Sequence, residues 1–364
     1  MATRTTTVVL IVRGGDLYVD DGLVEQADPS TRKIMSPKRK TERAVPATMK
    51  AAAIARFGAP SVLKLHELPT PEPEPNQILI EIHTAGVGGW DGDMRSGEWK
   101  PPGRPKFPRV LGLDGSGIVV AKGKRVKRFA IGDRVWAYDY ENAAFYAQYV
   151  AVDADSAGRV PKRMSLREAG AGACTGLTAL QGVADHAEVR RGQTVLVFGA
   201  TGAVGSLALQ FAKARGARVI ATATGRKATQ LVRSLGARVA IDARSRDAAD
   251  VLKAAAPDGV DVVLAFAGGR DLGRLLDLVT RGGRIVYPNG VDPEPEARSG
   301  IRVKGYDAAG GAQEFAQLRR AVEAARLKVP IAGVYVLSQA AEAHRRLQGH
   351  VLGRLVLGVR RGER

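Results

Sequence analysis

The stretch Thr194–Thr222 reads TVLVFGATGAVGSLALQFAKARGARVIAT. It opens with five residues of buried-strand character, and a glycine-rich turn and an amphipathic helical pattern follow. The spacing Ala200-x-Gly202-x-x-Gly205 has the form of a dinucleotide-binding fingerprint with alanine at its first position. This motif indicates a dinucleotide site only where it lies between a strand and a helix, as it does here. The stretch therefore predicts a Rossmann-type unit that binds a dinucleotide.

The residues of this turn have distinct expected roles. Gly202 lets the backbone approach a pyrophosphate, and Gly205 allows the helix to pack closely on the strand. The amides of Ala203 and Val204 lie at the start of the helix, so they would donate hydrogen bonds to the pyrophosphate with help from the helix dipole. Ala200 takes the place of the first glycine.

The end of the second strand predicts which nicotinamide cofactor is bound. NAD sites place an acid roughly 20 residues after the fingerprint, where it accepts a hydrogen bond from the ribose 2′-hydroxyl. No acid occurs between Gly205 and Asp242. Instead Thr224, Arg226 and Lys227 follow the strand, and the two basic residues are placed to meet a 2′-phosphate. We therefore expect NADPH; the alternative is that both are solvated loop residues in a chain with 55 basic residues.

The chain after Gly192 alternates strand and helix patterns, which predicts a parallel sheet with helices on both faces. The expected strands are Thr194–Phe198, Arg218–Thr222, Val239–Asp242, Val260–Phe266, Arg284–Tyr287 and Ile301–Lys304. Before it, short β-type runs begin at Met49, and the proline-rich LPTPEPEPNQ between the first two excludes helix. Ser165 is a plausible N-cap for a helix that starts at Leu166.

Composition limits the class of protein. The 364 residues suit two domains, and the apolar fraction of 45% and charged fraction of 25% are those of an ordinary globular protein. No apolar run approaches the roughly 18 residues of a membrane-spanning helix. Cys174 is the one cysteine, which excludes an intrachain disulfide. The net charge of +18 could serve phosphate-bearing ligands or nucleic acid, but the basic residues are scattered.

From MKAAAIARFG at Met49 onward, the chain resembles the medium-chain dehydrogenase/reductase superfamily. In chain order, the shared blocks are LGLDGSG, GDRV, GLTAL, GATGAVG, GGRIV and GRLVL. The resemblance implies an α/β fold in which a Rossmann-type doubly wound parallel sheet domain is inserted into a GroES-like β-barrel domain. We expect residues 1–48 to be a flexible N-terminal extension with one strand at Thr6–Val12. The catalytic domain would begin at 49–165 and be completed at 306–364. The NADP-binding domain at 166–305 would lie between these two parts.

The resemblance also bears on metal. Zinc-dependent relatives hold a catalytic zinc through a Cys, a His and a further Cys, and the matching positions here are Gly88, Leu113 and Cys174. One thiolate cannot hold a catalytic zinc. The acids that accompany the metal are present as Asp91 and Asp114. We therefore expect no metal, and the chain looks like the zinc-independent quinone oxidoreductase, or zeta-crystallin-like, branch.

The same resemblance supplies the other expected site residues. Near the nicotinamide or its phosphates these are Thr178, Phe266, Ala267, Asn289 and Arg354. The candidates for the substrate pocket are Trp90, Asp91, Asp93 and Tyr146, with Tyr138, Tyr140 and Phe145 as further wall residues. Where many quinone oxidoreductases carry an Asn and a Tyr, this chain has Gly88 and Asp93, which weakens any inference about the substrate.

The expected function is an NADPH-dependent, zinc-independent reductase of a small hydrophobic quinone, enone or carbonyl compound. The family further implies a homodimer. We also expect a cytoplasmic protein with no membrane partner, and the lack of an aromatic RNP-type motif disfavours nucleic acid as a partner. Two alternatives stay open at this point. One is an NADP-dependent alcohol dehydrogenase, which Gly88 and Leu113 disfavour. The other is a non-enzymatic protein that binds NADPH or RNA through its positive charge.

Overall fold

The structure is a computed structural model that describes residues 10–13, 16–19, 45–99, 105–141 and 144–360. The chain divides into two units, Met1–Ala44 and Val45–Arg364. In the first unit, β1 (Leu10–Arg13) and β2 (Asp16–Val19) form an antiparallel hairpin. The prediction of a single strand missed β2, because its four residues are few and begin with an acid. The expected flexibility of 1–48 falls mostly on residues outside the described ones, so it stays a prediction.

The second unit contains the predicted doubly wound sheet. Its six strands are parallel and lie in the order β13-β12-β11-β14-β15-β16, which is the 3-2-1-4-5-6 order of a Rossmann domain. Their bounds are β11 (Thr194–Phe198), β12 (Arg218–Thr222), β13 (Val239–Ile241), β14 (Val260–Ala265), β15 (Val279–Pro288) and β16 (Arg302–Tyr306). The bounds of β11 and β12 match the prediction, whereas β15 begins at Val279, five residues before the expected Arg284.

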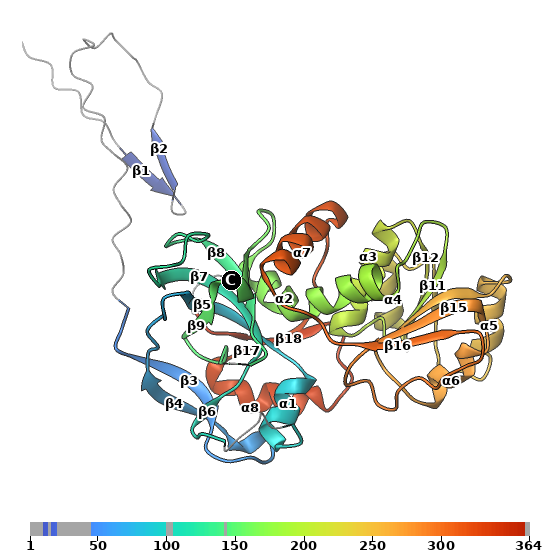
Figure 1. Cartoon of the computed structure of the whole chain (residues 1–364), viewed down its shortest axis with the longest axis horizontal. Helices are drawn as coiled ribbons and strands as arrows, with labels where there is room; N and C mark the ends of the chain where they lie inside the picture. The colour runs from blue at the N-terminus through green and yellow to red at the C-terminus, as the bar shows by residue number, and fades with distance from the viewer. Residues whose placement is uncertain (1–9, 14–15, 20–44, 100–104, 142–143, 361–364) are drawn as a thin grey trace, which may run out of the picture. The chain divides into compact units, whose positions relative to one another are not determined.

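Alternate side chains of β11 enter different apolar cores. Val195 and Val197 pack in the core that includes residues of α3 and α4, and Leu196 packs in the core that includes residues of α5 and α6. Figure 1 shows these helix pairs on opposite faces of the sheet. A strand covered on both faces is apolar at every position, which explains the uninterrupted TVLVF. The helices are α3 (Ala203–Ala214), α4 (Arg226–Leu235), α5 (Ala248–Ala255) and α6 (Arg270–Leu276).

The other strands build the barrel-like part of the molecule. Seven of them form one sheet: β5 (Gln77–Val87), β7 (Asp114–Lys122), β8 (Arg134–Tyr138), β9 (Tyr149–Asp153), β10 (Ala157–Arg159), β17 (Ile331–Val336) and β18 (Arg354–Gly358). A second sheet has three: β3 (Thr48–Ile54), β4 (Leu63–Pro69) and β6 (Arg109–Val110). The helices of this part are α1 (Gly89–Ser96), α7 (Ala312–Ala325) and α8 (Ala340–Leu347).

Helix α2 (Leu166–Gln181) leads from the barrel strands to the Rossmann strands. The predicted cap is confirmed, because the Ser165 hydroxyl accepts a hydrogen bond from the Glu168 amide while the Glu168 carboxylate accepts one from the Ser165 amide. A turn of π-helix, Gly182–His186, follows the last turn of α2.

The C-terminal strand β18 returns to the first strands of the barrel. It pairs antiparallel with β5, where Leu355 lies opposite Val87. Just before it, the Gly353 amide donates a 2.8 Å hydrogen bond to the carbonyl of Thr201 in the glycine-rich turn. Strand β18 therefore starts where the barrel meets the nucleotide-binding turn, and its first residue is Arg354.

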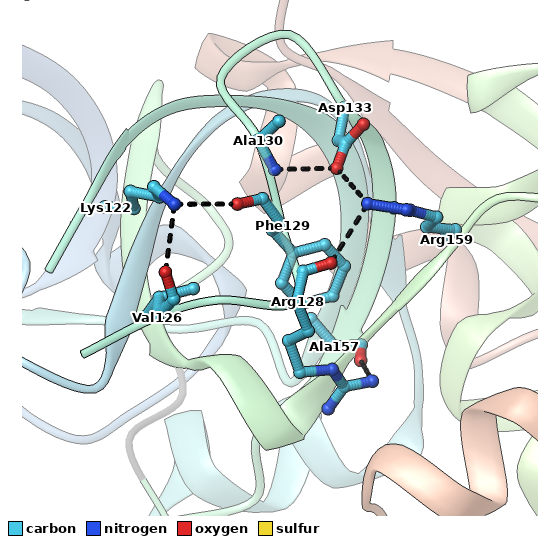
Figure 2. Close-up of polar contacts among 8 residues, drawn as sticks. All are labelled: Lys122, Val126, Arg128, Phe129, Ala130, Asp133, Ala157 and Arg159. Atoms are coloured by element: carbon cyan, nitrogen blue, oxygen red, sulfur yellow. Dashed lines mark hydrogen bonds and ion pairs between the residues drawn. The ribbon is translucent and has the colours of Figure 1, made fainter. Parts of the chain in front are cut away.

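Part of the positive charge near β7 is used to hold a loop. In Figure 2 the Lys122 ammonium donates to the carbonyls of Val126 and Phe129, and the Arg159 guanidinium donates to the Arg128 carbonyl and pairs with Asp133. These cations satisfy backbone oxygens that would otherwise lack partners. They therefore help to hold the loop, and the Arg159 charge is also balanced by Asp133. No helix within the described ranges is long and apolar enough to cross a membrane.

Candidate active site

A cleft of about 910 Å³ lies between the barrel strands and the Rossmann strands. Its lining comes from both parts of the molecule. It includes the end of β5 and the start of α1, the segment after β8, helix α2, the glycine-rich turn, the ends of β15 and β16, and the start of β18. A cleft of this volume suits a nucleotide cofactor and a small substrate.

The glycine-rich turn forms one wall of the cleft. Gly202, Ala203, Val204 and Gly205 all line it, and Gly202 is the N-cap of α3. A Cβ on Gly205 would clash with the carbonyl oxygen of Gly199, so only glycine permits this approach of helix to strand. The first amides of α3 have no carbonyl partner within the helix and are free to donate to a pyrophosphate. The turn therefore fits the expected cofactor.

The first fingerprint position differs in detail from the expectation. Ala200 is buried, and the residue that lines the cleft is Gly199, whose φ of +77° favours glycine. The Gly199 amide donates a 2.9 Å hydrogen bond to the hydroxyl of Thr222 on the neighbouring strand β12. The glycine before Ala200 in the quoted stretch was the signal for this residue.

The residues expected at the 2′-phosphate lie at the end of β12 and outside the cleft. Arg226 and Lys227 are exposed and are the first two residues of α4, whose N-cap is Gly225. The Thr224 hydroxyl donates a 2.8 Å hydrogen bond to the carboxylate of Asp242, which follows the adjacent strand β13. The sequence has no acid along β12, but the parallel pairing of β12 with β13 brings the carboxylate of Asp242 next to Thr224.

Three expected nicotinamide residues line the cleft: Thr178, Phe266 and Asn289. Thr178 is in the last turn of α2, where its hydroxyl donates to the Cys174 carbonyl at 3.0 Å and its carbonyl accepts from the Tyr306 hydroxyl at 2.7 Å. The imidazole of His186, from the π-helical turn, stacks on the Tyr306 ring with 4.5 Å between centroids. Sequence reasoning missed Tyr306, which also lines the cleft, and Ala267 does not line it.

Gly88, Leu113 and Cys174, the positions that hold zinc in zinc-dependent relatives, come together at the cleft. They offer one thiol and no other ligand atom. Burial raises the pKa of the Cys174 thiol to about 12, so the thiolate that zinc requires is disfavoured. No group of three or more His, Cys, Asp or Glu residues within the described part of the chain could hold a metal ion. These residues do not fit a catalytic zinc.

The guanidinium of Arg354 fills the space beside Gly88. A Cβ on Gly88 would lie 3.0 Å from Arg354 Nη1, although the backbone of Gly88 is extended and would accept any residue. Arg354 Nη2 donates to Asp114 Oδ1 at 2.8 Å, and Asp114 Oδ2 accepts from the Cys174 amide at 3.0 Å. The cation expected near the cofactor phosphates thus lines the cleft but pairs with a buried carboxylate.

Of the four residues expected in the substrate pocket, Trp90 lines the cleft and the other three do not. Asp91 is 1% exposed, and its carboxylate accepts a 2.8 Å hydrogen bond from the Gly88 amide. Burial raises the pKa of the Asp91 carboxyl to about 7, although the nearby Arg354 guanidinium opposes this shift. Tyr146 is fully buried, and Asp93 is a half-buried residue of α1.

The Tyr146 hydroxyl lies 3.1 Å from Nε2 of His344 on helix α8. Burial lowers the pKa of the His344 imidazole to about 3, so this ring is neutral at physiological pH. The same effect holds the pKa of the Tyr146 hydroxyl well above its usual value. This pair is a buried hydrogen-bonded contact between barrel and helix, and nothing in its geometry reaches the cleft.

Two sequence-family models match the chain. Residues 74–162 match the alcohol dehydrogenase GroES-like domain, and residues 203–314 match the zinc-binding dehydrogenase domain. The quinone oxidoreductase of Sus scrofa is 32% identical over 308 residues, which cover 81% of this chain and 93% of that protein. The chain belongs to the quinone oxidoreductase branch of the medium-chain dehydrogenase/reductase superfamily. It is accordingly an oxidoreductase of a family that uses a nicotinamide cofactor.

Solved structures of the superfamily agree with this fold. An NAD-dependent alcohol dehydrogenase superposes with a TM-score of 0.80 at 30% identity, covering 86% of this chain and 100% of that one. A mycobacterial protein solved in complex with NADPH superposes with a TM-score of 0.74 at 26% identity, covering 85% of this chain and 100% of that one. One neighbour is NAD-dependent and the other was solved with NADPH, so the family alone does not select between NAD and NADP.

Proposed function

We propose that this oxidoreductase is an NADPH-dependent reductase that acts without zinc on a quinone or an activated alkene. The position of the Arg354 guanidinium supports the metal-free part most directly. It fills the space beside Gly88, pairs with Asp114, and leaves Cys174 as the one potential zinc ligand of the three matched positions. The relationship to quinone oxidoreductases supports the substrate class.

Two observations support the choice of NADPH. Arg226 and Lys227 are exposed at the start of α4, where free helix amides and the helix dipole also favour an anion. Neither side chain is engaged with another described residue by a hydrogen bond or an ion pair. Asp242 acts in the opposite direction, because its carboxylate lies next to Thr224. Two cations against one carboxylate favour the 2′-phosphate.

The cleft residues supply binding and orientation. The first amides of α3 would hold the pyrophosphate, while Thr178, Phe266 and Asn289 would flank the nicotinamide ring. When bound, reduced nicotinamide supplies the hydride that adds to an electrophilic carbon of the substrate. One proton completes the reduction. Asp91, Asp93 and Tyr146 do not line the cleft, and burial raises the pKa of the Tyr138 and Tyr140 hydroxyls that do. We therefore assign this proton to water entering the cleft.

The test is the oxidation of NADPH by purified protein, followed by the loss of absorbance of the reduced nicotinamide. The acceptors are 1,4-naphthoquinone and a simple enone, with and without a zinc chelator. We expect turnover that the chelator does not change, and less than one-tenth equivalent of zinc by elemental analysis. Loss of activity on chelation, with zinc bound at one equivalent, would overturn the metal-free assignment.

A second arm of the same assay supplies NADP⁺ and primary or secondary alcohols. The high TM-score with an NAD-dependent alcohol dehydrogenase is the observation that favours this alternative. Alcohol oxidation without quinone or enone reduction would replace the proposed function by a dehydrogenase activity. The homodimer expected from the resemblance stays a prediction, to be checked by sedimentation.

A further inference from the structure

Three aromatic side chains meet at the barrel side of the cleft. The ring centroids of Trp90, Trp99 and Tyr140, which we call the aromatic triad, are separated by 6.3 Å (Trp90 to Trp99), 6.2 Å (Trp90 to Tyr140) and 5.1 Å (Trp99 to Tyr140). Trp90 meets both partners nearly at right angles. Trp90 and Tyr140 line the cleft, and Tyr140 is 38% exposed. Rings arranged edge to face leave ring faces available to a ligand.

The charge along the cleft is opposite to the charge of the whole chain. The described residues that line it include four carboxylates, on Asp139, Glu141, Asp153 and Asp307, and one cation, on Arg354. The Arg354 charge is already balanced by Asp114. A chain with a net charge of +18 therefore presents an acidic lining at its cleft.

Two of these carboxylates accompany the triad. Glu141 follows Tyr140 directly in the chain, and Asp307 follows strand β16. The Asp307 carboxylate is close enough to Tyr140 to raise the pKa of its hydroxyl, together with the larger effect of burial. Both carboxylates are exposed, and neither forms an ion pair with another described residue. Their charge is therefore directed at whatever enters the cleft.

We propose that the substrate carries a positively charged substituent, which binds over the aromatic triad and faces Asp307 and Glu141. This inference rests on the proposed function, because the reducible part of the same molecule would lie at Thr178 and Cys174. Cations bind over the faces of Trp and Tyr rings, and carboxylates add a favourable field. An anionic substituent would meet repulsion from the same carboxylates.

The test compares three 1,4-naphthoquinones that differ in one side chain: neutral ethyl, trimethylammonioethyl and sulfonatoethyl. We expect kcat/KM for the cationic compound to exceed that for the anionic compound by roughly tenfold to a hundredfold at low salt, and the ratio to fall as salt screens the charges. Asp307→Asn combined with Glu141→Gln should reduce the ratio at least threefold, because it lowers kcat/KM for the cationic compound more than for the anionic compound. Asp258→Asn, at an exposed acid that does not line the cleft, is the matched control.

A binding measurement keeps this inference separate from the proposed function. Two of the three tryptophans belong to the triad, so quenching of tryptophan fluorescence reports its occupancy. The probes are naphthalenes with the same two charged side chains, which cannot be reduced. Preferential binding of the cation in the absence of quinone turnover would retain the inference and reject the proposed function. Equal binding of both probes, or an unchanged ratio in the double variant, would overturn the inference.

Discussion

The guanidinium of Arg354 and the carboxylate of Asp114 form an ion pair of 2.8 Å, with side chains that are 11% and 0% exposed. The two residues are far apart in sequence. Strands β18 and β7 both pair antiparallel with β5, which brings Arg354 and Asp114 together beside Gly86 and Gly88. A Cβ on Gly86 would clash with both partners, so this glycine makes room for the pair. The ion pair is thus built into the sheet.

Replacing Arg354 by Met should destabilise the fold strongly. The Asp114 carboxylate would stay buried without a counter-charge, and breaking a buried pair costs about 3–5 kcal/mol. The double variant with Asp114→Asn should recover part of that loss. Urea unfolding measures both changes. The control is Arg319→Met, which breaks a half-exposed pair with Glu323 and should cost less than about 1 kcal/mol. Equal losses of unfolding free energy for Arg354→Met and Arg319→Met would contradict the assignment of Arg354 to a buried ion pair.

Asp91→Asn should make the stability of the protein less sensitive to a rise in pH up to about 7. The folded-state pKa of about 7 lies above the ordinary value of 3.8, so between these values the folded chain holds a proton that the unfolded chain has released. The free energy of unfolding therefore falls as pH rises through this window, by up to about 1.4 kcal/mol per pH unit, and levels off above pH 7. The asparagine cannot ionise and should still accept from the Gly88 amide.

Unfolding free energies of wild type and Asp91→Asn at pH 5.5 and pH 8 measure this effect. We expect the variant to gain stability relative to wild type between the two pH values. Other titrating groups, including Asp114, are common to both proteins and cancel in the difference. A difference that is independent of pH would show that Asp91 is ionised throughout.

Cys174 should react slowly with iodoacetamide although it lines the cleft. Burial raises the pKa of its thiol to about 12, and alkylation requires the thiolate. At pH 8 we expect the folded protein to react at least about a hundredfold more slowly than the urea-unfolded protein. The assay is unambiguous because the chain has one cysteine. A rate equal to that of a free thiol would refute the assigned environment.

Cofactor choice should depend on residues that follow both β12 and β13, which are neighbouring strands of the sheet. We expect wild type to prefer NADPH over NADH by roughly tenfold to a hundredfold in kcat/KM, since screening reduces each exposed charge contact. Changing Arg226 and Lys227 to Ala should erode this preference mainly through KM, because the 2′-phosphate is remote from the reacting carbon. Asp242→Asn should increase the preference, because it removes a neighbouring negative charge.

The control for cofactor choice is Arg233→Ala. This residue is exposed in the last turn of α4, and its replacement should change neither kcat nor KM for either cofactor. If the double alanine variant keeps its full preference, the 2′-phosphate site lies elsewhere. Equal use of NADH by wild type would reject the choice of NADPH itself.

The N-terminal boundary should lie at Val45, four residues before the expected Met49. Strand β3 begins at Thr48, whose hydroxyl donates to the Glu67 carboxylate at 2.7 Å, and the Ala47 carbonyl accepts from the Thr70 amide at 2.9 Å. A variant that begins at Val45 should therefore keep its full Tm. One that begins at Met49 should fold and turn over but melt a few degrees lower. Insoluble protein from the Val45 variant would place residues 1–44 within the fold.

Several features of this protein were determined by the sequence alone. The TVLVF strand, the glycine spacing and the following helix predict the Rossmann unit, because strand burial, turn geometry and helical periodicity are local properties of the chain. The same locality explains the correct bounds of β11 and β12 and the cap at Ser165. The N-terminal strand β2 was missed because four residues carry too little periodicity.

The chemical surroundings of the site were decided by the tertiary structure. Parallel pairing of β12 with β13 brings Asp242 to Thr224, and pairing of β18 with β5 places Arg354 at Gly88. Burial then sets the protonation of Asp91 and Cys174, which lie in the sequence among residues of no special character. Strand pairing and burial depend on residues that are distant in the chain. A pattern read along the sequence therefore predicts the scaffold, and only the folded sheet fixes which charges and rings face the cleft.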